Sequence, residues 1–348
     1  MSEGKKIISK RKKEHLELCS TDDVSFKNKT NGFEYYDFIH CAITEVDINK
    51  IEFTNSFLGK TISYPFIISC MTGGTTKAEN INLRLASVAS ELNIPLGIGS
   101  QRHLLDNHSN DFIYKELRNR AKDIPMLGNI GAAQIVSLKD FNSIQKLIDL
   151  VEADGMVIHL NALQELLQPE GESNFTGLLK AINKLKKVIK VPLIIKEVGS
   201  GISTDSAKKL LENGVDAIDV AGAGGTSWAG VEILRNKNKK EIQFWDWGLP
   251  TSYCIKEIYK LKNDHTFTLI GSGGINSAID NAKAFALGAD LTASARIILQ
   301  TLNESGTSGV INLIKDWFET LRKILFLTGS NNLKELQKDK LIRKEELY

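Results

Sequence analysis

One unit recurs along most of this 348-residue chain: a short apolar strand, a polar or glycine-rich turn, and an amphipathic helix. Three joints between a helix and the next strand are nearly the same peptide, namely EADGMVI (152–158), ENGVDAI (212–218) and ALGADLT (286–292). In each joint we expect the glycine to provide a left-handed helix end, with a buried strand following at once. Such regular repetition restricts the chain to an α/β fold with a parallel sheet.

Eight strand segments can be counted: PFIISC (65–70), IPLGIG (94–99), PMLGNIG (125–131), GMVIHLN (155–161), PLIIKEVG (192–199), DAIDVAG (216–222), FTLIGSGG (267–274) and ADLTAS (289–294). Helices are predicted over 79–92, 111–121, 138–151, 175–188, 204–212, 277–287 and from 297 onward. Eight units match a closed (β/α)₈ TIM barrel. A doubly wound open sheet is the alternative, but its polar signals would gather at one switch point, whereas here they follow nearly every strand.

Three parts of the chain lie outside the repeating units. Residues 1–64 form an N-terminal appendage, in which FEYYDFIHCAITEVDI (33–48) predicts an antiparallel hairpin or cap. The barrel itself is predicted over 65–330, with a long insertion after the sixth strand, at 226–250, that we interpret as a lid over the barrel mouth. The last segment, 331–348, is dense in charge and predicts a solvated helix or a frayed tail.

Composition excludes several classes of function. The 44 basic and 42 acidic residues nearly cancel, which argues against binding to nucleic acid or to an anionic membrane surface. The four cysteines lack the spacing of a zinc site, and no segment has the apolar length of a signal peptide core or a membrane span. We therefore expect a cytoplasmic protein that acts on a small molecule.

The densest polar cluster, HLNALQE, begins at His159, directly after the fourth strand. His159, Asn161, Gln164 and Glu165 place an imidazole, two amides and a carboxylate at the carboxyl end of a strand, where α/β folds bind ligands. Burial of so many hydrogen-bonding groups is costly without a ligand. The alternative is an ordinary helix start, with Asn161 as the cap and the other two side chains solvated.

Two glycine-rich or small-residue turns follow the seventh and eighth strands, GSGG (271–274) and ASAR (293–296). TIM barrels commonly bind phosphate in this place, with backbone N–H groups and a helix N-terminus. Lys196 interrupts the apolar run PLIIKEV and is expected to point into the barrel. It could serve as a Schiff-base nucleophile, as the cation beside an anionic cofactor, or as a structural partner of an acid such as Asp219. Together with Asn129 and the MTGG turn (71–74), the phosphate site and the lysine suit flavin mononucleotide (FMN).

With these motifs in place, the chain resembles the type 2 isopentenyl-diphosphate isomerases, which are FMN-dependent (β/α)₈ enzymes. The resemblance covers nearly the whole chain, and its most specific part is the combination of RKKEH (11–15) with HLNALQE (159–165). Further matches are MTGG (71–74), SQR (100–102), GNIGAAQ (128–134), QPEGE (168–172), KEVGSGIS (196–203) and AGAGGTSW (221–228). Other FMN barrels would lack RKxxH, and inosine monophosphate dehydrogenases would need a cysteine in the loop after the sixth strand. Arg296 departs from the pattern, because a smaller residue is expected near the phosphate.

The resemblance implies conversion of isopentenyl diphosphate to dimethylallyl diphosphate with reduced FMN, Mg²⁺ and NADPH as a source of electrons. It implies catalytic roles for His159, Gln164 and Lys196, and a metal-binding role for Glu165. The implied substrate-binding residues are Arg11, Lys12, His15, Ser100, Gln101, Arg102, Asn161 and Gln164. The implied cofactor-binding residues are Met71, Thr72, Gly73, Ser100, Asn129, Lys196, Thr226, Gly273, Gly274, Ala295 and Arg296.

Two other classes of function stay open at this point. One is an FMN-dependent oxidoreductase acting on a small anionic substrate, similar to a 2-hydroxy-acid oxidase, and the other is a flavin-binding barrel without catalysis. The isomerase differs from the first because its product forms without stoichiometric consumption of reductant. We also expect a homo-oligomer, although the sequence does not define the number of subunits.

Overall fold

The computed structural model describes residues 3–20, 24–105, 111–237 and 239–348. Eight parallel strands close into a barrel in the order β10-β11-β4-β5-β6-β7-β8-β9, which confirms the predicted (β/α)₈ fold. The last strand pairs with the first, with Ala293 opposite Ile67. The barrel strands are β4 (Phe66–Ile68), β5 (Leu96–Gly97), β6 (Met126–Gly131), β7 (Gly155–Leu160), β8 (Leu193–Glu197), β9 (Ala217–Asp219), β10 (Thr268–Ser272) and β11 (Leu291–Ser294).

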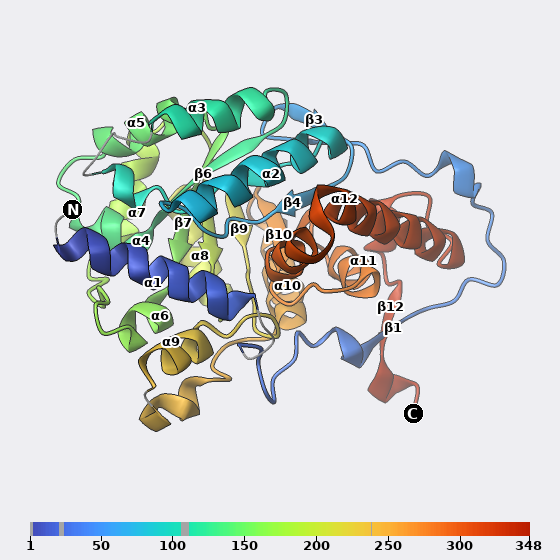
Figure 1. Cartoon of the computed structure of the whole chain (residues 1–348). Coiled ribbons are helices and arrows are strands. Elements are labelled where there is room, and N and C mark those ends of the chain that lie inside the picture. Colours follow the sequence, from blue (N-terminus) through green and yellow to red (C-terminus); the bar gives the residue numbers. More distant parts are fainter. Residues whose placement is uncertain (1–2, 21–23, 106–110, 238) are drawn as a thin grey trace.

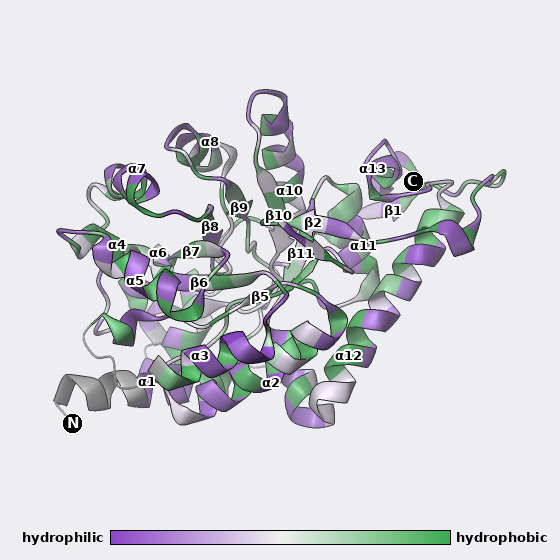
Figure 2. Cartoon of the chain, turned by 90° about the horizontal axis from the view of Figure 1, so that it is seen from above, coloured by the Kyte–Doolittle hydropathy of each residue, from purple (hydrophilic) through white to green (hydrophobic). Residues whose placement is uncertain are grey.

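Helices surround the strands on the outside (Figures 1 and 2). In α5, Ile144, Leu147, Ile148 and Val151 are buried at helical spacing, so one face packs on the barrel while the other meets solvent. The surrounding helices are α2 (Thr76–Leu92), α3 (Asp111–Arg120), α4 (Ala132–Ser137), α5 (Asn142–Val151), α7 (Leu178–Val188), α8 (Thr204–Glu212), α10 (Thr251–Tyr259), α11 (Ala278–Ala286) and α12 (Arg296–Leu327). Helix 204–212 is confirmed, whereas the segment predicted as one helix at 138–151 begins only at Asn142, after the separate α4.

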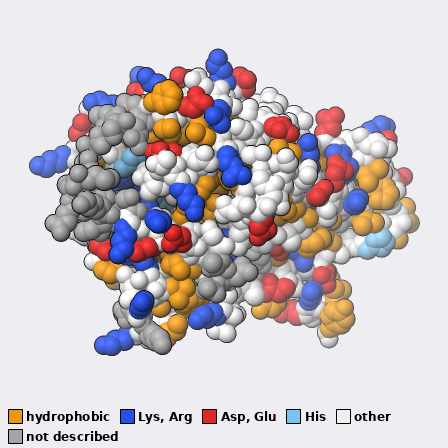
Figure 3. All heavy atoms as spheres, viewed as in Figure 1, with side chains coloured by type: hydrophobic (Ala, Val, Ile, Leu, Met, Phe, Trp, Pro, Cys, Tyr) orange, Lys and Arg blue, Asp and Glu red, His pale blue; other side chains and the backbone are white. Residues whose placement is uncertain are grey.

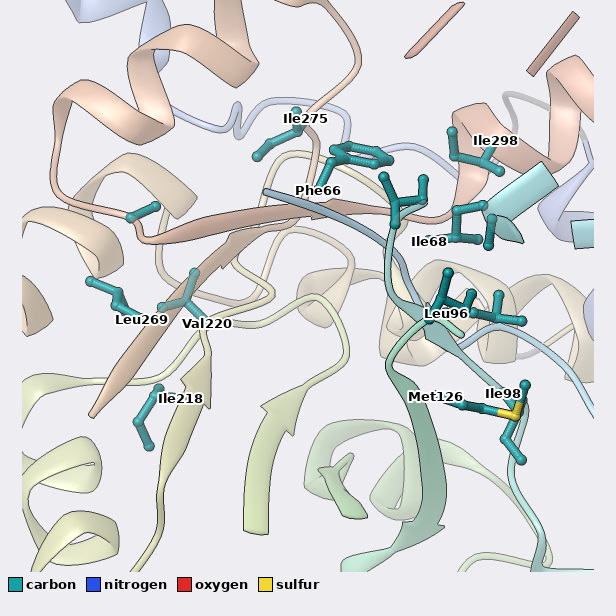
Figure 4. Close-up of a cluster of buried hydrophobic side chains, with 14 of the residues drawn as sticks. Phe66, Ile68, Leu96, Ile98, Met126, Ile218, Val220, Leu269, Ile275 and Ile298 are labelled. Atoms are coloured by element: carbon teal, nitrogen blue, oxygen red, sulfur yellow. The ribbon is translucent and has the colours of Figure 1, made fainter. Parts of the chain in front are cut away.

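The hydrophobic core has two layers, because side chains alternate between the two faces of a strand. Phe66 and Ile68 point outward into the large cluster between strands and helices (Figure 4). Ile67, between them, belongs to a second cluster inside the barrel. The same alternation explains why the strands of a barrel covered on both faces read as nearly continuous apolar runs.

A hairpin covers the amino-terminal end of the barrel. It consists of β2 (Asn55–Phe57) and β3 (Lys60–Ile62), joined by Leu58 and Gly59, which both have positive φ. Phe57 and Ile62 join the interior cluster. Leu58 lies so close to β7 that a Cβ atom on Gly155 would be 2.9 Å from its Cδ1 atom. Gly155 is therefore needed for packing, and the left-handed residue of that joint is Glu152, contrary to our expectation.

The N-terminal and C-terminal segments differ from prediction. Residues 33–48 form no hairpin of their own, because β1 (Tyr36–Phe38) pairs antiparallel with β12 (Leu341–Arg343) near the end of the chain. The charged tail is not frayed: α13 (Leu333–Leu336) buries Leu336 completely before β12 begins. Alternating residues indicate a strand but do not identify its partner.

The 3₁₀ helices are η1 (Phe33–Tyr35), η2 (Ile48–Lys50), η3 (Arg102–Leu104), η4 (Lys239–Phe244), η5 (Lys260–Asn263) and η6 (Lys344–Glu346).

Three helices lie near the carboxyl ends of the strands. They are α1 (Glu3–Cys19), α6 (Ala162–Leu167) and α9 (Trp228–Asn236), and α9 contacts both of the others. In Figure 1, α1 passes in front of the barrel with α6 and α9 beneath it. The described helices include none with the length and apolar character needed to cross a membrane.

Candidate active site

A cavity of about 260 Å³ opens at the carboxyl ends of the barrel strands. It brings together residues that are separated by up to 288 positions in the chain, from Arg11 to Leu299. Its wall contains all but one of the residues singled out from the sequence, namely Arg11, Lys12, His15, Met71, Thr72, Gly73, Ser100, Arg102, Asn129, His159, Asn161, Gln164, Glu165, Lys196, Thr226, Gly273, Gly274, Ala295 and Arg296. A substrate or cofactor in this cavity would contact residues from nearly every unit of the barrel.

Gln101 is the exception. Its side chain is fully buried, with Nε2 donating to Leu147 O at 3.1 Å and Oε1 accepting from Asn129 N at 3.1 Å. Gln101 thus ties the loop after β5 to β6 and does not line the cavity. Its neighbours Ser100 and Arg102 do line it.

His159, at the end of β7, is held as a neutral imidazole. Burial, together with the positive charges of Lys196 and Lys12, lowers its pKa to about 3. Its Nδ1 atom lies 2.9 Å from Asn129 Oδ1, which can only accept a hydrogen bond. The proton therefore resides on Nδ1, and Nε2 carries a lone pair.

Three residues of the HLNALQE motif form one hydrogen-bonded group. The Asn161 Nδ2 atom donates to Glu165 Oε1 at 3.0 Å and to Gln164 Oε1 at 3.2 Å. Asn161 makes no side-chain cap for α6, so the simple helix-start interpretation is wrong. Its own Oδ1 atom is buried and has no hydrogen-bond partner among the described residues. A buried acceptor of this kind indicates a missing ligand.

Lys196 and Asp219 occupy paired positions on β8 and β9. Lys196 is buried, and its Nζ atom donates to Glu197 O at 2.6 Å. Burial raises the pKa of the Asp219 carboxyl, and the ammonium group of Lys196 opposes that shift. The hydrogen bond of Lys196 therefore goes to a backbone carbonyl, and Asp219 influences it only through the electric field.

The turns after β9 and β10 meet with almost no space between them. A Cβ atom on Gly225 would lie 2.6 Å from Gly274 N, and Gly273 and Gly274 have φ values of +102° and +68°. Only glycine fits this close approach and this conformation. Beside these turns, α12 begins without a side-chain cap, because Ala295 is its N-cap residue. Uncapped N–H groups at a helix start favour an anion such as phosphate.

Helix α1 adds cations to the opposite side of the cavity. Lys12 Nζ donates to Gly73 O at 2.5 Å, and burial, together with the charges of Arg11 and Arg102, lowers the pKa of this lysine to about 8. His15 Nε2 lies 2.8 Å from Glu232 Oε1, and the His15 ring meets the edge of Trp228 at 5.3 Å. Through His15, α1 is fastened to α9.

Sequence reasoning missed several polar residues of the site. Glu232 is almost completely buried in α9 and contacts both His15 and Gln164, the latter at 3.3 Å. Gln134 and Glu172 hydrogen-bond to each other at 2.9 Å beside the cavity. A signal for Glu232 exists, because it interrupts an apolar helical face formed by Ala229, Val231 and Ile233. Gln134 and Glu172 end two of the motifs that carry the family resemblance, GNIGAAQ (128–134) and QPEGE (168–172), but no role was predicted for either side chain.

One face of the molecule carries mixed charge. On the face shown in Figure 3, Lys and Arg side chains are interspersed with Asp and Glu side chains. Within the cavity, the positive groups that could hold an anionic substrate or cofactor are Arg11, Lys12, Arg102, Lys196 and Arg296. Across the described ranges, no three His, Cys, Asp or Glu side chains gather as a metal site.

Comparison with known proteins agrees with this geometry. The chain matches the model of the FMN-dependent dehydrogenase family over residues 4–157 and 170–343. Three relatives are named isopentenyl-diphosphate delta-isomerase. The one from Chlorobium phaeobacteroides is 40% identical, with 99% of this chain and 98% of the relative covered. The one from Vibrio campbellii is 43% identical with 94% and 97% covered, and the one from Pyrococcus abyssi is 40% identical with 95% and 91% covered.

Solved structures support the fold at much lower identity. A flavocytochrome b2 variant superimposes with a TM-score of 0.70 at 19% identity, covering 94% of this chain and 82% of that one. A mandelate oxidase variant gives a TM-score of 0.64 at 15% identity, covering 94% of both chains. The chain belongs to the FMN-dependent dehydrogenase family and, within it, to the isopentenyl-diphosphate delta-isomerases.

Proposed function

We propose that this protein converts isopentenyl diphosphate to dimethylallyl diphosphate with bound FMN and Mg²⁺. The main observation in support is that α1 brings Arg11 and Lys12 into the same cavity as Lys196 and the Asn161–Gln164–Glu165 group. A flavin site alone would not need a second set of cations facing an acidic and amide-rich helix. A diphosphate bound through Mg²⁺ needs both.

FMN fits the side of the cavity formed by β8 to β11. The uncapped start of α12 and the paired glycine turns would hold its phosphate, with Thr226 and Arg296 beside them. Lys196 would place its ammonium group against the anionic edge of the reduced ring, and Met71, Thr72 and Gly73 would line the other edge. When bound, reduced FMN supplies a proton donor and acceptor and a negative charge near the substrate.

Mg²⁺ fits beside Glu165. This carboxylate is buried, and the neighbouring Asn161 Oδ1 atom has no partner among the described residues. Mg²⁺ prefers oxygen ligands and commonly keeps several waters and substrate phosphates, so one protein carboxylate is sufficient. Arg11, Lys12 and Arg102 would neutralise the rest of the diphosphate charge, and His15 would anchor α1 while they do so.

The chain's own groups explain how an unactivated double bond could be isomerised. Gln164 is neutral and is oriented by Asn161 and Glu232, so it can place or relay a proton at the alkene. His159 stays neutral and offers the Nε2 lone pair as a hydrogen-bond acceptor. Helix α1 lines the cavity through Leu16 and Cys19 as well as its cations, and would help to exclude water from the reacting carbons.

The flavin requirement is tested by the absorption spectrum of the purified protein and by anaerobic turnover. We expect flavin absorbance, and many product molecules per enzyme after one reduction with dithionite. NADPH should serve as an alternative electron source without stoichiometric consumption. Oxidation of one NADPH per product would instead support the oxidoreductase alternative, and a protein that binds no FMN after reconstitution would contradict the proposal.

Sedimentation of the holoenzyme would test the predicted homo-oligomer.

A further inference from the structure

The loop after α6, residues 168–172 with the sequence QPEGE, contributes an acid that the proposed mechanism does not use. We propose that Glu172 is a positioning residue of the diphosphate site, which holds Arg102 and Glu165 at a fixed spacing. This inference rests on the proposed function, because it concerns how that site receives its substrate.

Glu172 contacts three elements of the cavity wall at once. Its Oε1 atom accepts a hydrogen bond from Arg102 Nη2, and its Oε2 atom accepts from Gln134 Nε2 at 2.9 Å. Its backbone N–H donates to Glu165 Oε2 at 2.8 Å. One residue therefore links the loop after β5, helix α4 and helix α6.

The loop is built so that Glu172 returns to α6. A Cβ atom on Gly171 would lie 1.8 Å from Glu165 O, so only glycine permits the backbone to approach the helix this closely. Gly171 N donates to Gln168 O at 2.9 Å, which closes the turn. The position of Glu172 is thus set by backbone packing and not by the flexible side chain alone.

The chemistry of the three contacts suits a diphosphate. A guanidinium group has five N–H donors, so one directed at Glu172 leaves others for a phosphate oxygen. The backbone N–H of Glu172 fixes Glu165, the carboxylate that we assign to Mg²⁺. Because both groups are fastened to the same residue, their separation is preset before substrate arrives, which lowers the entropic cost of binding.

Glu172→Gln tests the proposal in the holoenzyme. The amide keeps the size of the side chain but removes the charge that attracts Arg102. We expect KM for isopentenyl diphosphate to rise about tenfold, because one charge-assisted contact that is partly open to solvent is lost. The value of kcat should change less than twofold. The affinity for inorganic pyrophosphate with Mg²⁺, measured by calorimetry, should fall by the same factor, and flavin absorbance should be unchanged.

Glu170→Gln is the matched control. Glu170 lies in the same loop and pairs with Arg235 at 3.0 Å, outside the cavity wall, so its loss should leave KM unchanged. In an Arg102→Gln background, Glu172→Gln should have little further effect on KM if Glu172 acts through Arg102. An unchanged KM in Glu172→Gln would overturn the proposal. A lower KM would also overturn it, because it would show that Glu172 competes with the substrate for Arg102. Wild-type protein without isomerase activity would instead refute the proposed function.

Discussion

The polar groups at the two ends of the barrel differ in how completely they are paired within the protein. At the amino-terminal end, three aspartates occupy equivalent places in the three similar joints, and each is paired with both a backbone N–H and a cation. At the carboxyl end, polar side chains crowd around a cavity, and two of their buried atoms, Asn161 Oδ1 and Gln168 Nε2, have no hydrogen-bond partner within the part of the chain that the structure describes. The first arrangement stabilises the fold, and the second leaves hydrogen-bonding capacity for a ligand.

The three aspartates share one pattern of contacts. Asp154, Asp216 and Asp290 each accept a hydrogen bond from a backbone N–H of the preceding barrel strand, at 2.8, 2.6 and 2.7 Å. Each returns a backbone N–H to the carbonyl of the same strand residue. Each also pairs with a cation, in the order Arg118, Lys186 and Lys262. The resemblance of the three joints in sequence therefore reflects a repeated clamp between neighbouring strands.

The largest effect is expected at the mouth. Gln164→Ala removes a neutral group that orients the reacting proton, and we expect kcat to fall about 10³-fold, within the range seen for proton-transfer groups. The free energy of unfolding should change little, because the side chain contributes no apolar packing. Steady-state kinetics and denaturant unfolding of one preparation would measure both. Full activity in this variant would mean that the mouth cluster is structural after all.

The opposite result is expected at the other end. Asp154→Ala leaves the guanidinium of Arg118, only 8% exposed, without its carboxylate, and should cost about 3 kcal/mol of unfolding free energy. Asp216→Ala is the matched variant: its carboxylate is 40% exposed, so the loss should be smaller. Both folded variants should keep the wild-type kcat/KM. A loss of activity in a folded variant would contradict the conclusion that the amino-terminal end of the barrel contributes only to stability.

A third variant separates metal binding from proton transfer. Glu165→Gln keeps the size of the side chain but removes its charge and one of its two acceptor oxygens, which weakens the proposed Mg²⁺ site. We expect about tenfold weaker Mg²⁺ activation. Excess Mg²⁺ should restore most of the rate, because other oxygen ligands remain. The same excess should not restore Gln164→Ala. Failure of rescue in Glu165→Gln would remove the metal role from this residue.

The smallest effect is a pH dependence. Burial lowers the pKa of Lys12 to about 8, so this side chain is cationic below that pH and loses its charge as the pH rises through it. We expect kcat/KM for the diphosphate to decline above pH 8, by at most about tenfold per pH unit for a single group. Lys12→Arg stays charged and should abolish the decline. An identical profile in this variant would assign the titration elsewhere.

The barrel could be predicted because each strand and helix carries its own local pattern. The eight apolar runs and the glycine turns at Gly273 and Gly274 identify both the fold and one end of the site. The HLNALQE cluster was found because polar groups directly after a buried strand are unusual. These signals are local in sequence, so no knowledge of distant contacts was needed.

Contacts between distant segments could not be predicted in the same way. The pairing of β1 with β12 joins residues about 300 positions apart, and no pattern in either strand names its partner. We predicted that Gln101 binds the substrate, but its side chain donates a hydrogen bond to Leu147 O and does not line the cavity. Glu232 acquires its contacts only when α1, α6 and α9 assemble. Glu172 acquires its contacts only when the loop after β5, α4 and α6 assemble.

The pairing of β4 with β11 has a consequence for synthesis of the chain. Because Ile68 pairs with Ser294, the sheet cannot close until almost all of the barrel has left the ribosome. Until then, β4 and the most recent strand each present an unpaired edge, which is prone to join other chains. Fragments that end before β11 should therefore aggregate, whereas the complete chain passes this stage in one late, non-local folding step.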